Sequence, residues 1–254
     1  MNMKKLENVI YSQKHEEKLD IYLPEGKGFK TVVYFHGGGL VAHGKACEGA
    51  VNIAESFVKK GYAFVSADYR IYPNAKFPDF LVDGADAIAY VKAHIAEWGG
   101  SGEMIVSGQS AGAWISMMLC LDKQYLTGVG IDPLEIAGWI IDSSQMTAHF
   151  NVLRHEQGVH PCLQRINEYA PLYYVDEKTA FTKMLLIFYE QDMPTRPEQN
   201  LLFYKTVFEF KKDADIAYQM LPGGHCHGSS VKDDDGEYAY VKTAFKWLEE
   251  KGLL

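Results

Sequence analysis

Cysteine is scarce in this sequence, and its placement is informative. The four cysteines are widely separated and no pair forms a C-x-x-C motif; they are Cys47, Cys120, Cys162 and Cys226. This spacing argues against a zinc site and against a disulfide framework. We therefore expect no metal, no cofactor and a reducing cytoplasm as the compartment.

Long apolar runs and excess positive charge are also lacking. No stretch is long and apolar enough to span a bilayer, and residues 1–8 have no apolar run after their lysines, so we expect no signal peptide. Acidic residues outnumber basic ones by 33 to 25, which gives a net charge of −8. A nucleic acid or an anionic membrane surface is therefore not an expected partner.

What is present suits a globular protein with a substantial core. The chain has 254 residues, of which 47% are hydrophobic, and it contains no internal repeat. This length favours one large α/β domain over two small ones. We expect strands at 9–11, 19–23, 31–35, 62–65, 104–106, 136–141, 184–189 and 216–221, and helices at 47–60, 79–98, 113–119, 197–211 and 236–251.

The alternation of these strands and helices predicts βαβ units around a mostly parallel sheet. The segment 143–178 interrupts the alternation and is longer than an ordinary connection. It contains three histidines, for which structural roles are the simpler interpretation. We interpret the segment as a small cap that shapes a substrate pocket, with an ordinary surface excursion as the alternative.

Residues 108–112 fit the pattern G-x-S-x-G. A strand-forming run precedes them and good helix formers follow, which is the context that a nucleophilic serine at a sharp turn requires. A serine hydroxyl is a weak nucleophile unless a base can reach it, and such a turn exposes Ser110 to one. The alternative is a glycine-rich β-to-α turn with an incidental serine.

Three other strand ends carry groups of matching chemistry. His36 to Gly39, directly after the strand at 31–35, can point backbone N–H groups at an oxyanion. Asp192 follows the strand at 184–189, and His225 and His227 follow the last strand. The carboxyl ends of parallel strands share one edge, so these residues can meet there, in the Ser, Asp, His order of the α/β-hydrolase arrangement.

These motifs resemble those of the α/β-hydrolase carboxylesterases of the hormone-sensitive-lipase-like group. The closer match is to short bacterial acetyl, xylan and feruloyl esterases. Besides the two glycine motifs, the resemblance includes Asp68-Tyr-Arg70 followed by Phe77-Pro78 and Asp83, and Ala170-Pro-Leu172. It covers nearly the whole chain from about residue 18.

The resemblance implies a serine esterase mechanism. Ser110 would attack the ester carbonyl, a histidine would transfer the proton, and Asp192 would orient that histidine. The backbone N–H groups of Gly37, Gly38 and Ala111 would bind the oxyanion.

The identity of the base stays open between two histidines. The family's G-x-x-H-G pattern fits His227, whereas the distance from the strand end and the Gly-His-Cys sequence favour His225, which we prefer. We expect the other histidine to line the pocket. Cys226 lies between them without a nucleophile turn, so we expect it to have a packing role.

Three functions fit these residues. The first is a carboxylesterase acting on small acyl or aryl esters, including acetylated or feruloylated carbohydrates, with a homodimer plausible by analogy. The second keeps the triad but cleaves another bond, as in an arylformamidase or peptidase of the same fold, because fold alone does not fix the substrate. The third is a catalytically silent binding protein, which would be expected to lack a triad member.

Overall fold

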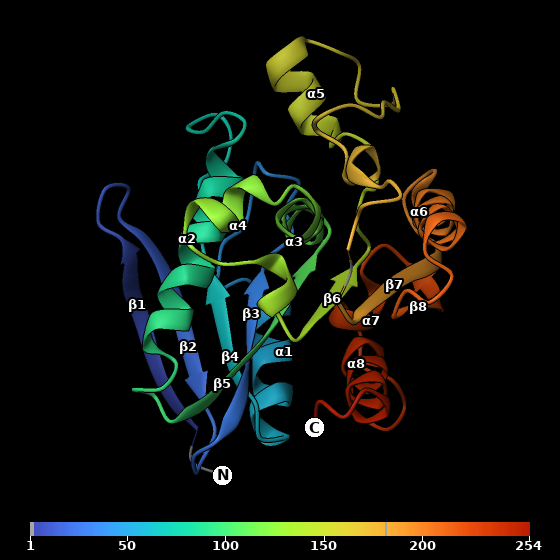
Figure 1. Cartoon of the computed structure of the whole chain (residues 1–254). Coiled ribbons are helices and arrows are strands. Elements are labelled where there is room, and N and C mark those ends of the chain that lie inside the picture. The colour runs from blue at the N-terminus through green and yellow to red at the C-terminus, as the bar shows by residue number, and fades with distance from the viewer. Residues whose placement is uncertain (1–2, 181) are drawn as a thin grey trace.

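The structure, a computed structural model, describes residues 3–180 and 182–254. Its centre is an eight-stranded sheet in the order β1-β2-β4-β3-β5-β6-β7-β8 (Figure 1). The strands are β1 (Lys4–Ser12), β2 (Glu17–Leu23), β3 (Phe29–Phe35), β4 (Ala63–Ala67), β5 (Gly100–Gln109), β6 (Gly138–Asp142), β7 (Met184–Gln191) and β8 (Ile216–Gly224). β1 and β2 pair antiparallel with their neighbours, and β3 to β8 run parallel.

Helices cover both faces of the sheet. The helical elements are α1 (Glu48–Lys59), α2 (Asp79–His94), α3 (Ala111–Leu121), α4 (Gln124–Gly128), η1 (Pro133–Glu135), α5 (Phe150–Gln157), η2 (Pro171–Tyr174), α6 (Arg196–Phe210), α7 (His227–Ser230) and α8 (Ala239–Glu250). α1 and α8 pack on one face of the sheet, and α2, α3 and α6 pack on the other.

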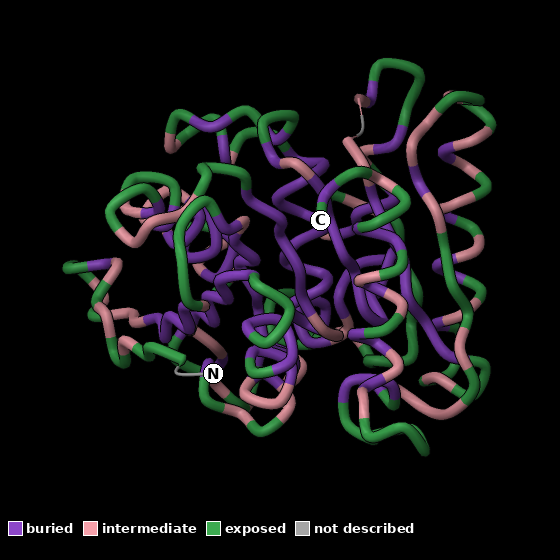
Figure 2. Tube along the Cα trace, turned by 90° about the horizontal axis from the view of Figure 1, so that it is seen from below, coloured by how far each residue is buried: buried purple, intermediate pink, exposed green. Residues whose placement is uncertain are grey.

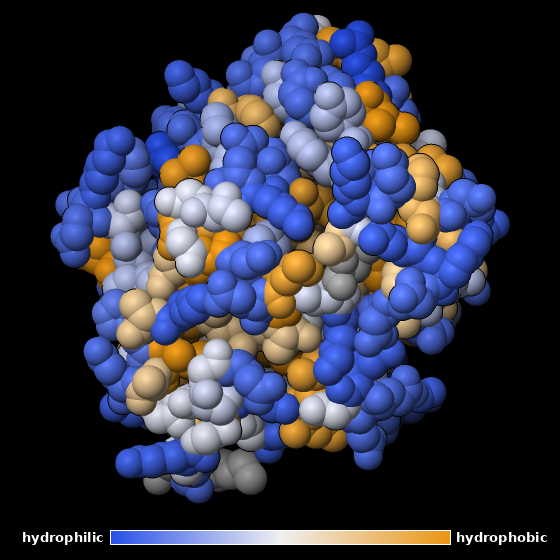
Figure 3. Space-filling model, viewed as in Figure 1, coloured by the Kyte–Doolittle hydropathy of each residue, from blue (hydrophilic) through white to orange (hydrophobic). Residues whose placement is uncertain are grey.

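The two cores follow from the period-two alternation of the central strand. Val32 and Tyr34 of β3 point into the core under α1 and α8, whereas Val33 and Phe35 point into the core under α2 and α3. Because both faces are covered, the strand is apolar along its length. Figure 2 shows the resulting buried interior, with exposed residues mainly at the periphery. The face in Figure 3 is largely hydrophilic, with scattered apolar groups.

The segment 143–178 contains α5 and η2, and α5 lies beyond the carboxyl ends of the parallel strands (Figure 1). Hydrogen bonds attach this segment to two loops at the same edge of the sheet. Asn151 Nδ2 donates to the Gly39 carbonyl at 2.6 Å. Glu156 Oε1 accepts from the Tyr72 hydroxyl at 2.7 Å and from Phe77 N at 2.8 Å. The segment therefore contacts the connections that follow β3 and β4.

The expected strands and main helices are confirmed, with different ends. The helix expected at 79–98 ends at His94, β8 continues through Gly224, and the short helices α4 and α7 were not predicted. Within the described residues, no helix combines the length and hydropathy required to cross a membrane.

Candidate active site

Ser110 stands in a strained turn between β5 and α3. Its backbone has φ of 53° and ψ of −111°, a conformation that a side chain disfavours. Hydrogen bonds hold it, because Ser110 N donates to the Asp142 carbonyl at 2.8 Å and Trp114 N donates to the Ser110 carbonyl at 3.0 Å. The backbone thus fixes the direction of the hydroxyl.

The flanking glycines of this turn are required by close backbone contacts. A Cβ on Gly108 would lie 2.3 Å from the Gly112 carbonyl oxygen, and one on Gly112 would lie 2.0 Å from the Phe35 carbonyl oxygen. Strand, turn and helix therefore approach more closely than any side chain would permit.

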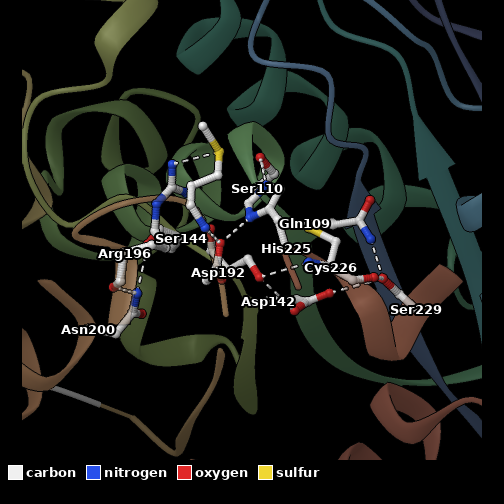
Figure 4. A network of polar contacts seen from close by, with 12 residues as sticks. Gln109, Ser110, Asp142, Ser144, Asp192, Arg196, Asn200, His225, Cys226 and Ser229 are labelled. Atoms are coloured by element: carbon white, nitrogen blue, oxygen red, sulfur yellow. Dashed lines mark hydrogen bonds and ion pairs between the residues drawn. The ribbon is translucent and has the colours of Figure 1, made fainter. Parts of the chain in front are cut away.

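The structure brings Ser110, His225 and Asp192 together (Figure 4). The Ser110 hydroxyl lies 2.9 Å from His225 Nε2. His225 Nδ1 is hydrogen-bonded to Asp192 Oδ1, and the Asp192 side chain is fully buried. Burial alone would raise the pKa of Asp192, but the hydrogen bond from His225 and its charge hold that pKa below the ordinary value. An ionised Asp192 favours the imidazole orientation in which Nε2 faces the serine.

His227 lies elsewhere. It begins α7, is exposed, and its ring lies against the Cα of Gly223. It is not among the residues that line the cavity at Ser110, so the expectation that the second histidine lines the pocket is wrong. Two other acids that follow the helix after Asp192 have surface positions, because Asp213 is exposed and Asp215 pairs with Lys251.

The glycine loop after β3 lies beside the serine. A Cβ on Gly37 would be 3.4 Å from the Ser110 Cβ, and Gly38 has φ of +111°. No hydrogen bond formed within residues 3–180 and 182–254 uses the backbone N–H of Gly37, Gly38 or Ala111. These three expected oxyanion donors are consequently available to a ligand.

The loop is supported from below by the Asp68-Tyr-Arg70 segment. The Tyr69 hydroxyl donates to the His36 carbonyl at 2.7 Å, and its ring stacks on the imidazole at 4.3 Å. Burial lowers the pKa of His36 to about 4, so this imidazole is neutral at pH 7. Arg70 forms a forked ion pair with Asp83, with Nη2 2.7 Å from Oδ1 and Nε 2.8 Å from Oδ2. The motif therefore ties the glycine loop to α2.

Above the serine lies a cavity of about 380 Å³. Its lining residues include the glycine loop, the serine and its histidine, and two apolar side chains, Phe150 from α5 and Met193. The cavity is open to solvent on one side and has apolar walls close to the nucleophile. Such a space suits a small ester with one apolar portion.

Sequence reasoning missed Asp142, a fully buried carboxylate at the end of β6. Its Oδ2 accepts from the Ser229 hydroxyl at 3.2 Å, and Ser229 is also bonded to the Gln109 side chain. Burial is the main cause that raises the pKa of Asp142 to about 7. The network joins the nucleophile turn to the loop after β8 (Figure 4). The position of Asp142 at the carboxyl end of a parallel strand was the available signal in the sequence.

Other expected residues have structural positions. Cys226 is buried, and burial raises the pKa of its thiol well above the ordinary value, as a packing role requires. His149 is buried and accepts from Asn151 N at 3.2 Å, and His155 stacks on Tyr72. Within the described residues, no group of three or more His, Cys, Asp or Glu is arranged to hold a metal ion.

Comparison with known families agrees with this geometry. Residues 19–153 match the family model BD-FAE. The chain belongs to the BD-FAE family. The matched residues run from β2 into α5 and include the glycine loop and the Ser110 turn.

Curated relatives of this BD-FAE chain include plant and mycobacterial proteins. It is 30% identical over 148 residues to the probable isoprenylcysteine alpha-carbonyl methylesterase ICMEL1 of Arabidopsis thaliana. The aligned residues cover 57% of this chain and 30% of that relative. It is 29% identical over 123 residues to esterase LipC of Mycobacterium tuberculosis, and these residues cover 46% of this chain and 30% of LipC. The chain thus spans about a third of the length of these relatives.

Solved structures match nearly the whole BD-FAE chain. Esterase B from Lactobacillus rhamnosis has a TM-score of 0.80 at 16% identity, over 98% of this chain and 85% of that protein. An esterase from Thermogutta terrifontis, Est2, has a TM-score of 0.75 at 20% identity, over 100% of this chain and 95% of that protein. These matches confirm the expected α/β-hydrolase fold, and with the family match they confirm the expected relationship to its carboxylesterases.

Proposed function

We propose that this chain is a serine carboxylic ester hydrolase. One observation carries the proposal, the continuous hydrogen-bonded series from the Ser110 hydroxyl through His225 to the buried Asp192. Such a series is the requirement for activating a serine at neutral pH. Membership of the BD-FAE family and the esterase names of the relatives support it.

In the proposed reaction, Ser110 attacks the ester carbonyl as His225 accepts its proton. The backbone N–H groups of Gly37, Gly38 and Ala111 stabilise the oxyanion, and the loss of one such donor typically costs about 2.7–4 kcal/mol of barrier. His225 then protonates the leaving alcohol, and water hydrolyses the acyl-enzyme by the same route. Asp192 stabilises the imidazolium in both steps.

We propose small acyl or aryl esters as the substrate class, including acetylated or feruloylated carbohydrates. The cavity of about 380 Å³ at Ser110 supports this size. Phe150 belongs to the segment 143–178, so we also propose that this segment acts as a cap that forms part of the substrate pocket.

The test is hydrolysis of p-nitrophenyl esters from acetate to octanoate by the wild type and by Ser110→Ala. We expect activity on acetate that decreases with chain length and is lost in Ser110→Ala. His225→Asn should be as inactive, whereas His227→Asn should keep wild-type rates. A folded protein without activity on any ester would contradict the proposal, and formamides would then be assayed.

A further inference from the structure

A second cavity, of about 410 Å³, adjoins the one at Ser110. We call it the side cavity. The two cavities share two lining residues, Phe150 and Met193. The remaining lining of the side cavity includes Gln145, Gln164, Gln199 and Arg196. A molecule whose ester lies at Ser110 can therefore extend a substituent past Met193 into a largely apolar cavity that three glutamines and Arg196 border.

Arg196 is the charged group of this cavity, and it is almost fully buried, with 3% exposure. Nη1 donates to the Ser143 carbonyl at 2.5 Å, and Nη2 lies 3.8 Å from Met193 Sδ. Among residues 3–180 and 182–254, no carboxylate oxygen lies within 4.0 Å of the Arg196 guanidinium, so it forms no ion pair with them. A buried cation without a carboxylate partner is costly unless something repays the loss of hydration.

The neighbouring polar groups are already engaged with one another. Gln199 Oε1 accepts from Met146 N at 3.1 Å and from Thr147 N at 3.2 Å, while its Nε2 donates to Gln164 Oε1 at 3.0 Å. A guanidinium has five N–H donors, and Arg196 uses one on a carbonyl and one on a weak thioether acceptor. Among the buried side chains that line this cavity, the Nε2 groups of Gln145 and Gln199 each donate to two acceptors, so the unused donors belong to the positively charged Arg196.

We propose that Arg196 binds a carboxylate on the ester substrate, so that the protein prefers esters of acidic molecules over matched neutral esters. The inference rests on the proposed function and names the substrate class for the same site. A carboxylate would match the planar donor fork of arginine. Met193 is exposed and its Sδ lies 3.8 Å from Nη2, and this flexible thioether can turn aside to admit the ligand.

The competing explanation is that Arg196 serves only as a counter-charge to Asp192. Burial lowers the pKa of this guanidinium, and the charge of Asp192 opposes that effect. The two explanations differ in one measurable ratio. A counter-charge affects the triad, so its removal changes the rates of acidic and neutral esters by the same factor. A carboxylate-binding residue changes the ratio between them.

The experiment compares 4-acetoxybenzoate with 4-acetoxybenzamide, the 3-substituted pair, and p-nitrophenyl glutarate with its neutral monoamide, all corrected for spontaneous hydrolysis. We expect the wild type to prefer the acid in at least one pair by about tenfold or more in kcat/KM, mostly through KM, as a charge-assisted hydrogen bond would give. Arg196→Met should abolish this preference. Arg165→Met, which removes an exposed charge of the segment 143–178 outside the cavity lining, should retain it.

Three results would overturn the inference. They are equal rates for acid and neutral ester in every wild-type pair, a preference that persists in Arg196→Met, or a preference lost equally in Arg165→Met. If Arg196→Met does not fold, Arg196→Lys keeps the charge without the fork and should reduce the preference severalfold.

A binding measurement separates this inference from the proposed function. Calorimetry of Ser110→Ala with the same esters should give a lower Kd for the acid of the preferred pair, and the difference should vanish when Arg196→Met is added. If no ester is hydrolysed, the proposed function fails, and this measurement still decides the role of Arg196. Equal affinities for the acid and the amide would refute the carboxylate-binding role of Arg196.

Discussion

At the residue scale, Gly112 sets the approach of the nucleophile turn to β3. A Cβ at this position would lie 2.0 Å from the Phe35 carbonyl oxygen, whereas one on Gly128 would meet no atom within 4 Å. Backbone cannot yield as a flexible side chain can. We expect Gly112→Ala to lower the free energy of unfolding by about 3 kcal/mol or more and to abolish ester hydrolysis.

The matched control is Gly128→Ala, which should change the free energy of unfolding by less than about 1 kcal/mol and leave the rate unchanged. Urea unfolding followed by fluorescence, together with the p-nitrophenyl acetate rate, measures both effects. Similar stabilities for the two variants would show that β3 and the turn can separate at little cost.

Asp142 gives a pH-dependent prediction at the same scale. Its pKa is raised from 3.8 to about 7, with burial as the largest cause. Between these values the native state binds more protons than the unfolded state, so this residue makes the free energy of unfolding fall as pH rises through the window. We expect Asp142→Asn to lose less stability than the wild type between about pH 5 and about pH 8.

Urea unfolding at the two pH values measures this difference. Asp213→Asn removes an exposed carboxylate and should keep the wild-type change with pH. An Asp142→Asn protein whose stability changes with pH as much as the wild type would mean that Asp142 titrates normally in the native state.

At the scale of elements, the glycine loop depends on the connection after β4. The Tyr69 hydroxyl donates to the His36 carbonyl at 2.7 Å, immediately before Gly37. Tyr11 on β1 donates to the Asp68 carbonyl at the same distance, one residue away from Tyr69. We expect Tyr69→Phe and Tyr11→Phe each to cost about 1 kcal/mol of stability.

The two variants should differ in activity. Because Tyr69, unlike Tyr11, bonds directly to the loop that carries the proposed oxyanion donors, Tyr69→Phe should lower kcat by about three- to tenfold with little change in KM. Tyr11→Phe should leave kcat unchanged. Steady-state kinetics on p-nitrophenyl acetate decides the matter, and equal kcat values for both variants would assign Tyr69 a purely structural role.

The elements also show what sequence patterns could predict. Short runs of apolar residues predicted each strand, and the signal is clearest for β3, β4 and β6, which are buried on both faces. The same signal placed Asp192 correctly, directly after β7. It could not choose between His225 and His227, because β8 continues past Pro222 to Gly224 and His227 begins the short helix α7. That choice depends on loop geometry, which leaves no periodic pattern.

At the scale of the whole molecule, the parallel sheet made the site predictable. The rule that carboxyl ends of strands share an edge joined Gly37, Ser110 and Asp192 across more than half of the chain. The same rule places Asp142 at this edge but could not reveal its burial, and it could not reveal Arg196, which begins α6. Their importance lies in burial and in the partners they have or lack, and these are properties of packing between elements rather than of local sequence.

The attachment of α5 to the rest of the molecule gives the last prediction. Glu156 Oε1 accepts from the Tyr72 hydroxyl and from Phe77 N, and it joins the segment 143–178 to the connection after β4. Loss of both bonds in Glu156→Ala should favour local opening by about 1–2 kcal/mol. The amides of α5 should then exchange hydrogen about tenfold faster, while those of β3 and β5 keep their rates.

Hydrogen exchange followed by mass spectrometry measures this opening, with Glu177→Ala as the control from an exposed position of the same segment. Faster exchange in β3 and β5 as well would mean that α5 opens only when the whole molecule unfolds. Faster exchange confined to α5 would mean that the segment opens separately from the sheet. Because Phe150 of α5 lines both cavities, Glu156→Ala should then also raise KM for the larger esters more than for acetate.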